Sequence, residues 1–107
     1  MNLSVVIPVF NEEKTLLEIL NRINILKKYC NMEIIVVDDG SKDKSKEILQ
    51  NNTELYSKSI YLGNNFGKGK AVIEGIKKCT FDYILVQDAD LEYDPKDIIM
   101  FIDETKK

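Results

Sequence analysis

The chain of 107 residues has the size of a single domain, and a chain of this length buries roughly two thirds of its unfolded surface. Its content of 44% hydrophobic and 31% charged residues, with two prolines and five glycines, excludes a disordered or low-complexity chain. The formal net charge of −3 gives no long-range attraction to nucleic acid or an anionic membrane, so we expect no nucleic-acid partner, although a few lysines can still hold a phosphate.

The first predicted strand covers residues 3–9 ("LSVVIPV") and is followed by a predicted helix over about residues 12–28. The strand is nearly continuous in apolar residues, which is typical of a strand covered on both faces in a parallel sheet. The helix has one apolar stripe, because its apolar residues recur at steps of three and four: Leu16, Ile19, Leu20, Ile23 and Leu26. The segment "PVFNEE", residues 8–13, connects the two elements.

The second predicted strand, residues 33–38 ("EIIVVD"), leads into "VDDGS" and a helix that ends near Asn51. Asp39 or Ser41 can cap this helix, and capping alone would explain a lone Asp-Gly-Ser. An acid at this place can also accept hydrogen bonds from a base N–H or a ribose hydroxyl. Because Asp38 and Asp39 both follow the strand and only one of them can cap, the pair favours a binding site.

The third predicted strand, residues 57–63 ("SKSIYLG"), precedes the loop "GNNFGKGKA" and a helix that opens at 67–69 and runs through Lys78. Glycines let the backbone approach a ligand, and Lys68 and Lys70 lie beside a helix N-terminus that suits anions. The spacing matches neither a Walker A loop nor a dinucleotide fingerprint. Taken alone, the loop is better explained as a solvated lysine pair.

The fourth predicted strand, residues 82–88 ("DYILVQD"), runs into a series of acids. Asp88 and Asp90 are two residues apart in an extended segment, so their side chains project to the same side, and Glu92 follows if the extension continues. Such carboxylates repel one another unless a cation compensates, and Mg²⁺ or Mn²⁺ is held well by one or two carboxylates plus substrate phosphates. The pattern therefore favours a metal site over a solvated acidic turn, while Asp94 and Pro95 begin a fourth helix.

The order βαβαβαβα predicts an α/β fold with a Rossmann-like, open, mostly parallel sheet and right-handed connections. Ligands of such sheets bind outside the carboxyl ends of the strands, where all four segments above lie. The chain has no histidine, which excludes a His-based triad and an HExxH site. Proton transfer would fall to a carboxylate, a lysine or a tyrosine.

Cysteine usage and hydropathy bear on location. Cys30 and Cys79 stand far apart and in no CxxC pattern, so we expect two reduced, part-buried thiols in a cytoplasmic protein rather than a disulfide or a zinc site. The N-terminus lacks the features of a signal peptide, and no apolar run approaches about 18 residues. Any membrane contact, at the cytoplasmic face, would then be peripheral or made by a missing segment.

Four segments together resemble family 2 glycosyltransferases of the GT-A fold: "VVIPVFNEE", "IIVVDDGSKD", "NNFGKGKAVIEG" and "ILVQDADLEYDP". The similarity is greatest to the branch of dolichyl- or polyprenyl-phosphate sugar synthases. The motifs occur in family order at all four strand ends, which makes them far more specific together than singly. The resemblance covers the whole chain but only the front half of the family's catalytic domain. It implies that residues 1–107 form one nucleotide-sugar-binding domain of a truncated catalytic domain.

The resemblance also implies roles for single residues around the nucleotide. The first motif would line the nucleotide pocket with Pro8, Phe10, Asn11 and Glu12, where many relatives have tyrosine at the place of Phe10. In the second motif, Asp38 or Asp39 would contact the base or the ribose.

The third and fourth motifs are implied to hold the donor diphosphate. The loop from Asn65 to Lys70 would border the nucleotide and its diphosphate, with Lys68 as the cation. Asp88, which also borders the nucleotide, and Asp90 look like the DxD pair that binds the bridging Mg²⁺ or Mn²⁺. Glu92 is a less secure third metal ligand.

The function implied is metal-dependent, inverting transfer of a hexose from a UDP- or GDP-sugar to an acceptor such as a polyprenyl phosphate. The catalytic base of that reaction is expected beyond Lys107, so the alternative is a non-catalytic nucleotide-sugar-binding or assembly domain without the acceptor half. A magnesium phosphohydrolase is a third hypothesis. It is disfavoured because its nucleophilic aspartate normally follows the first strand, where this chain has "PVFNEE".

Overall fold

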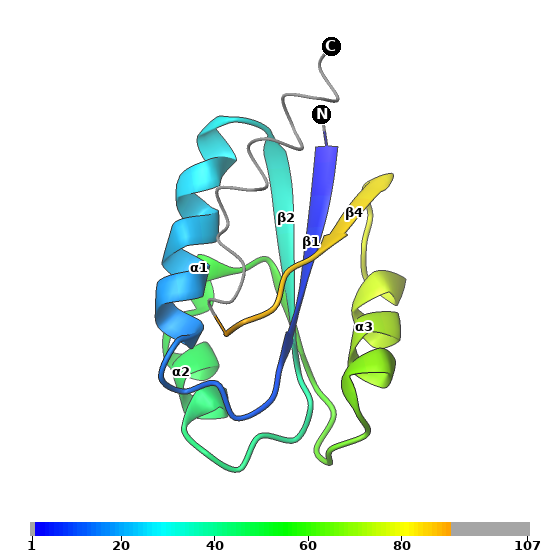
Figure 1. Cartoon of the computed structure of the whole chain (residues 1–107). Helices are drawn as coiled ribbons and strands as arrows, with labels where there is room; N and C mark the ends of the chain where they lie inside the picture. Colours follow the sequence, from blue (N-terminus) through cyan, green and yellow to red (C-terminus); the bar gives the residue numbers. More distant parts are fainter. Residues whose placement is uncertain (1, 91–107) are drawn as a thin grey trace.

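Strands and helices alternate along the chain in this computed structural model, which describes residues 2–90 (Figure 1). The elements are β1 (Asn2–Val9), α1 (Leu16–Ile25), the short 3-10 helix η1 (Leu26–Lys28), β2 (Asn31–Asp38), α2 (Ser45–Asn51), η2 (Thr53–Leu55), β3 (Lys58–Tyr61), α3 (Lys68–Lys77) and β4 (Tyr83–Val86). The predicted helix start at Asp94 and Pro95 lies outside the described residues. Within residues 2–90, no helix combines the length and apolar character needed to cross a membrane.

The four strands form one sheet in the order β3-β2-β1-β4, and every neighbouring pair is parallel. β1 pairs with β2 from Asn2↔Asn31 to Val9↔Asp38, and with β4 from Leu3↔Tyr83 to Val6↔Val86. The predicted α/β, Rossmann-like, parallel architecture is therefore confirmed. Because parallel strands end at the same edge of a sheet, the segments after β1, β2, β3 and β4 meet there.

Two helical layers cover the sheet, with α1 and α2 on one face and α3 on the other (Figure 1). The alternation of side chains along β1 divides the core in the same way. Leu3, Val5, Ile7 and Val9 belong to the larger cluster with the buried stripe of α1, while Val6 belongs to a smaller cluster with Ala71 of α3. The predicted apolar stripe of the first helix is confirmed, since all of its residues are buried: Leu16, Ile19, Leu20, Ile23 and Leu26.

Two predicted helix starts are wrong. The first helix begins at Leu16 rather than near residue 12, because the Glu12 carbonyl accepts hydrogen bonds from both Thr15 N–H and Leu16 N–H and closes a turn before the helix. The second begins at Ser45, and neither Asp39 nor Ser41 caps it. Asp43 lies before this helix instead, where its Oδ1 accepts the Ser45 N–H at 2.9 Å.

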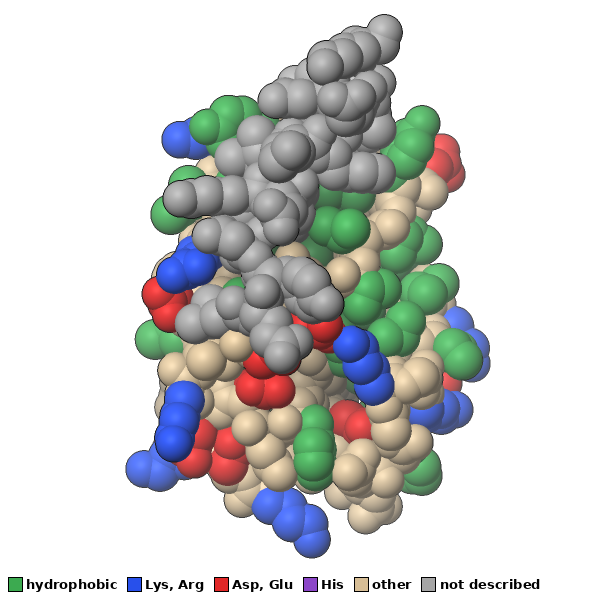
Figure 2. All heavy atoms as spheres, in the orientation of Figure 1, with side chains coloured by type: hydrophobic (Ala, Val, Ile, Leu, Met, Phe, Trp, Pro, Cys, Tyr) green, Lys and Arg blue, Asp and Glu red, His purple; other side chains and the backbone are tan. Residues whose placement is uncertain are grey.

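β4 differs from the prediction of strands covered on both faces. Tyr83, Ile84 and Val86 are 52%, 39% and 40% exposed, whereas β1 and β2 are almost entirely buried. The reason is position, because β4 is at the edge of the described sheet and α3 packs against β1 and β2. Figure 2 shows hydrophobic side chains gathered over β4 and α3.

A buried glutamate joins the strands at the edge of the sheet where they begin. Glu33 of β2 is 8% exposed, and its Oε2 accepts hydrogen bonds from Ser4 Oγ of β1 at 2.5 Å and from Thr80 N–H at 2.6 Å. Lys58 Nζ of β3 lies 3.4 Å from Oε1. Burial raises the pKa of Glu33, but these hydrogen bonds and Lys58 outweigh it and lower the pKa from 4.5 to about 2.

Glu33→Gln is expected to lower the free energy of unfolding by about 2 kcal/mol at pH 7. The reason is that the amide would turn an N–H group toward the donors that already surround the carboxylate, and it would remove the charge that pairs with Lys58. A folded-state pKa of about 2, below the unfolded value of 4.5, gives stability that is complete above pH 4.5 and is lost as the pH falls toward 2. Denaturant unfolding of both proteins at pH 7 and pH 3 should thus show a smaller difference at pH 3. Equal stability at pH 7, or a difference independent of pH, would contradict this role.

Candidate functional site

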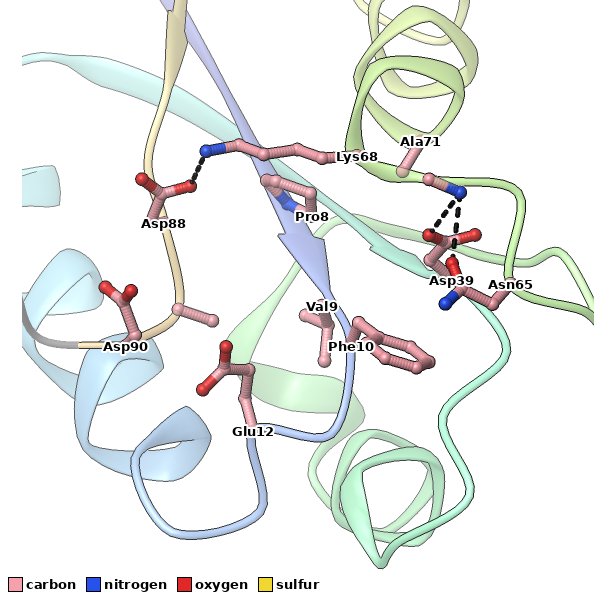
Figure 3. Close-up of a pocket in the computed structure, with 12 residues that line it drawn as sticks. Pro8, Val9, Phe10, Glu12, Asp39, Asn65, Lys68, Ala71, Asp88 and Asp90 are labelled. Carbon is pink, nitrogen blue, oxygen red and sulfur yellow. Dashed lines mark hydrogen bonds and ion pairs between the residues drawn. The ribbon is translucent and has the colours of Figure 1, made fainter.

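A pocket of about 440 Å³ lies at the carboxyl ends of the strands. Its walls come from the end of β1 and the segment after it, from the segments that follow β2 and β4, and from the loop before α3 with the start of that helix (Figure 3). The lining residues are Pro8, Val9, Phe10, Glu12, Asp39, Asn65, Gly67, Lys68, Ala71, Asp88, Ala89 and Asp90. The structure therefore brings together residues from all four motifs, as the sheet topology predicts.

The segment after β1 gives the pocket an aromatic wall and a carboxylate. Phe10 is 39% exposed, and Figure 3 shows its ring and the Glu12 carboxylate beside the hollow. Asn11, which was predicted to line the pocket as well, is not among its lining residues in the described chain. Its backbone has φ +53°, which asparagine tolerates, and its Oδ1 accepts the Lys42 N–H at 2.8 Å. Asn11 thus ties the end of β1 to the loop after β2.

Asp39 is the pocket acid from the segment after β2, and it holds the neighbouring loop. It is 3% exposed, and its carboxylate accepts the N–H groups of Phe66 and Gly67 at 2.8 and 3.0 Å. These bonds fix the chain between β3 and α3 against the end of β2. Nothing in the local sequence indicates this contact, because 27 residues separate Asp39 from Phe66.

Asp38 has a different place from its neighbour. Its side chain is 2% exposed and is not among the lining residues of the pocket in residues 2–90. Its Oδ2 accepts the Ser41 N–H at 3.2 Å, while its buried Oδ1 accepts no hydrogen bond from a described residue. Of the two adjacent acids, Asp39 is therefore the one that faces the pocket.

Asp88 and Asp90 lie just beyond β4, one before and one after the buried Ala89 in the sequence. The strand ends at Val86 and the chain bends at Ala89 and Asp90, so Asp90 does not continue the extended segment that was predicted. Both nevertheless line the pocket (Figure 3). Thr15 holds this segment against the start of α1, since its Oγ1 donates to the Ala89 carbonyl at 2.5 Å. Glu92 lies outside the described residues.

Acidic side chains outnumber basic ones in the pocket. Within residues 2–90, four acids line it and one lysine, Lys68; the acids are Glu12, Asp39, Asp88 and Asp90. Burial, followed by the charges of Asp90, Asp43 and Asp88, raises the pKa of Glu12, although the Thr15 hydroxyl lowers it. An excess of carboxylates around an open hollow suits a bound cation.

The oxygen atoms of the pocket include possible ligands of a divalent cation. The pocket offers carboxylate oxygens, which are the ligands that Mg²⁺ and Mn²⁺ prefer. No three Asp, Glu, His or Cys side chains within residues 2–90 lie close enough to hold a metal by themselves. Asp88 and Asp90 could therefore hold such a cation only together with other oxygens, such as those of a bound phosphate, which is the usual way in which Mg²⁺ is held.

Asp39→Asn is expected to loosen the loop before α3, because the amide keeps one acceptor but turns an N–H group toward the second backbone donor. We expect faster hydrogen exchange at the Phe66 and Gly67 amides and a loss of about 1 kcal/mol in unfolding free energy. Asp82→Asn, at an exposed position outside this pocket, is the matched control. Unchanged exchange of both amides in Asp39→Asn would show that Asp39 does not hold the loop.

Comparison with known families gives one match that spans almost the whole chain. Glycosyl transferase family 2 matches residues 4–107. Among curated proteins, an undecaprenyl-phosphate 4-deoxy-4-formamido-L-arabinose transferase of Pseudomonas savastanoi pv. phaseolicola is 40% identical over 100 residues, which are 89% of this chain and 30% of the relative. The chain thus spans about a third of the length of the curated relatives that it matches.

Solved structures show the same architecture. S. aureus TarS 1–349 in complex with UDP-GlcNAc is 30% identical, with a TM-score of 0.76, over 97% of this chain and 32% of that one. Glucosyl-3-phosphoglycerate synthase from Mycobacterium tuberculosis, in complex with Mn²⁺, UDP and glucosyl-3-phosphoglycerate, has a TM-score of 0.79 at 22% identity, over 97% of this chain and 39% of that one. The second likeness concerns the fold alone.

Proposed function

The chain belongs to glycosyl transferase family 2, and from that premise we propose that it is the donor-binding part of a metal-dependent, inverting glycosyltransferase. The reaction is transfer of a hexose from a UDP- or GDP-sugar to an acceptor such as a polyprenyl phosphate. The observation that carries the proposal is that one pocket at the strand ends is lined by residues of every motif, among them Phe10, Asp39, Lys68, Asp88 and Asp90. The names of the matched relatives, an undecaprenyl-phosphate sugar transferase and a protein crystallised with UDP-GlcNAc, support the chemistry.

The two ends of the pocket suit the two ends of a nucleoside diphosphate. Phe10 offers a partly exposed ring beside Asp39, an apolar and acceptor-bearing surface that suits a base and a ribose. Lys68 stands at the first residue of α3, where the helix N-terminus favours an anion. In this proposal Asn65 and Lys68 border the diphosphate, and Pro8 and Glu12 complete the wall.

Asp88 and Asp90 are proposed to hold Mg²⁺ or Mn²⁺ together with the donor diphosphate. When bound, the cation would supply Lewis-acid stabilisation of the charge that develops on the departing nucleoside diphosphate. The Thr15 hydroxyl, through the Ala89 carbonyl, keeps the segment that carries both carboxylates in place. No residue of the described chain is assigned as the catalytic base.

The competing hypothesis is a nucleotide-sugar-binding domain that performs no transfer. The motivation for this hypothesis is that the chain spans only about a third of the length of its curated relatives. Incubation of the protein with Mn²⁺, radiolabelled UDP- or GDP-sugar and undecaprenyl phosphate separates the two hypotheses. Labelled lipid product supports the transferase, whereas saturable donor binding without product in any donor and acceptor combination supports the binding domain.

A further inference from the structure

Lys68 reaches across the pocket to an acid on its other side. Its Nζ lies 2.5 Å from Asp88 Oδ1, and the two residues come from different elements, the start of α3 and the segment after β4. Figure 3 shows the lysine side chain extending over Pro8 to this carboxylate. The ion pair therefore joins the lysine that is proposed to bind the diphosphate to one of the two proposed metal ligands.

The other lysines of α3 form a different kind of pair. Lys70 and Lys77 both contact Glu74 of the same helix, at 2.9 and 3.2 Å. Among the residues of 2–90 that line the pocket, Lys68 is the only basic one, and three acids line it besides Asp88. Its ammonium thus lowers the repulsion between these carboxylates, as a bound cation would.

The pair is well placed but weakly held. The Lys68 side chain is 61% exposed and that of Asp88 is 26% exposed. Ion pairs at this exposure contribute little to stability because water screens them. A doubly charged ion at the same carboxylate is attracted more strongly than an ammonium group, so the lysine is a replaceable partner.

We propose that Lys68 is a positioning residue that serves as the counter-ion of Asp88 until a divalent cation is bound there, and that its ammonium then pairs with the donor diphosphate. This inference rests on the proposed function for the identity of the second partner. It goes further by making Lys68 and the cation competitors for one carboxylate. Binding of the cation and of the diphosphate is then coupled, since each favours the arrangement that the other needs.

Lys68→Met tests the competition directly, with Mn²⁺ alone as the probe and free Mn²⁺ measured by electron paramagnetic resonance. Removing the competing ammonium should tighten Mn²⁺ binding about three- to tenfold. Lys77→Met is the matched control, because it removes the same charge from the same helix at a lysine that contacts Glu74, and it should leave the Mn²⁺ affinity unchanged. Equal or weaker Mn²⁺ binding by Lys68→Met, or no Mn²⁺ binding by either protein, would overturn the proposal.

A second titration separates this inference from the proposed function. In the wild-type chain, saturating UDP or GDP should tighten Mn²⁺ binding, and in Lys68→Met the factor of tightening should be several-fold smaller. If neither nucleotide changes Mn²⁺ binding by the wild-type chain, the proposed function fails. If the nucleotide tightens Mn²⁺ binding by the same factor in both proteins, Lys68 does not pair with the diphosphate, while the proposed function stands.

Discussion

Asp90→Asn is expected to lower the Mn²⁺-dependent affinity for the nucleoside diphosphate at least about a hundredfold. The reason is that the amide keeps the size of the side chain but removes the charge from one of two proposed metal ligands, and even outer partners of metal ligands contribute 10- to 100-fold. Within residues 2–90, no three Asp, Glu, His or Cys side chains lie close enough together to form a metal site. No other described carboxylate is therefore placed to replace that of Asp90. Calorimetric titration with UDP or GDP at constant Mn²⁺ measures the effect.

The control for this variant is Asp82→Asn, which changes an exposed acid outside the pocket by the same single charge. It should bind as the wild-type chain does. An affinity for the nucleotide in Asp90→Asn that equals the wild-type value, and still responds to Mn²⁺, would exclude Asp90 as a metal ligand.

Gly40→Ala is expected to lower the free energy of unfolding by about 3 kcal/mol, combining left-handed strain with overpacking. Gly40 has φ +73°, and a Cβ added there would lie 2.3 Å from Asn64 C and 2.6 Å from Asn65 N. These atoms are backbone, so relief requires the loop beside Asp39 to move. The substitution should therefore weaken nucleotide binding as well as stability.

Gly63→Ala is the matched control for Gly40→Ala, because Gly63 has φ +82° but no atom within 4 Å of an added Cβ. It carries the backbone strain without the steric clash and should cost about 1 kcal/mol. Denaturant unfolding of the two variants compares them. Equal losses would mean that the contact between Gly40 and the loop at Asn64 and Asn65 contributes nothing to stability.

The predictions that rested on continuous apolar runs agree best with the structure. β1 and β2 were located within two residues, since a buried parallel strand leaves an uninterrupted run of apolar residues. The order of strands and helices then placed the four motifs at one edge of the sheet. This topological rule explains why residues as distant as Pro8 and Asp90 were expected together and line one pocket.

The predictions that rested on single polar residues agree less well. Asp39 has the right type and place for a helix cap, yet its carboxylate binds backbone groups of a loop 27 residues away. Thr15 gave no signal of its own, although its hydroxyl holds Ala89 across 74 residues. Short polar side chains form whichever hydrogen bonds the assembled fold offers, and local sequence does not specify that choice.

The pocket wall also includes residues for which the sequence motifs predict no role. They are Val9, Ala71 and Ala89. Val9 and Ala89 each neighbour a predicted site residue, and such positions can be found only by treating a whole strand end as the site. Ala71 lies on the face of α3 that packs against Val6, so helix packing places it there.

Every binding role proposed here for a pocket residue requires that the pocket bind a nucleoside diphosphate sugar together with a divalent cation. Thermal unfolding of the wild-type chain with UDP- and GDP-sugars, each with Mn²⁺ and with EDTA, tests this claim most directly. A donor at about a hundred times its dissociation constant should add about 2.7 kcal/mol of stability, or roughly 10 °C for a chain of this size, and only with Mn²⁺. No shift with any donor in the presence of Mn²⁺, or the same shift in EDTA, would contradict the claim.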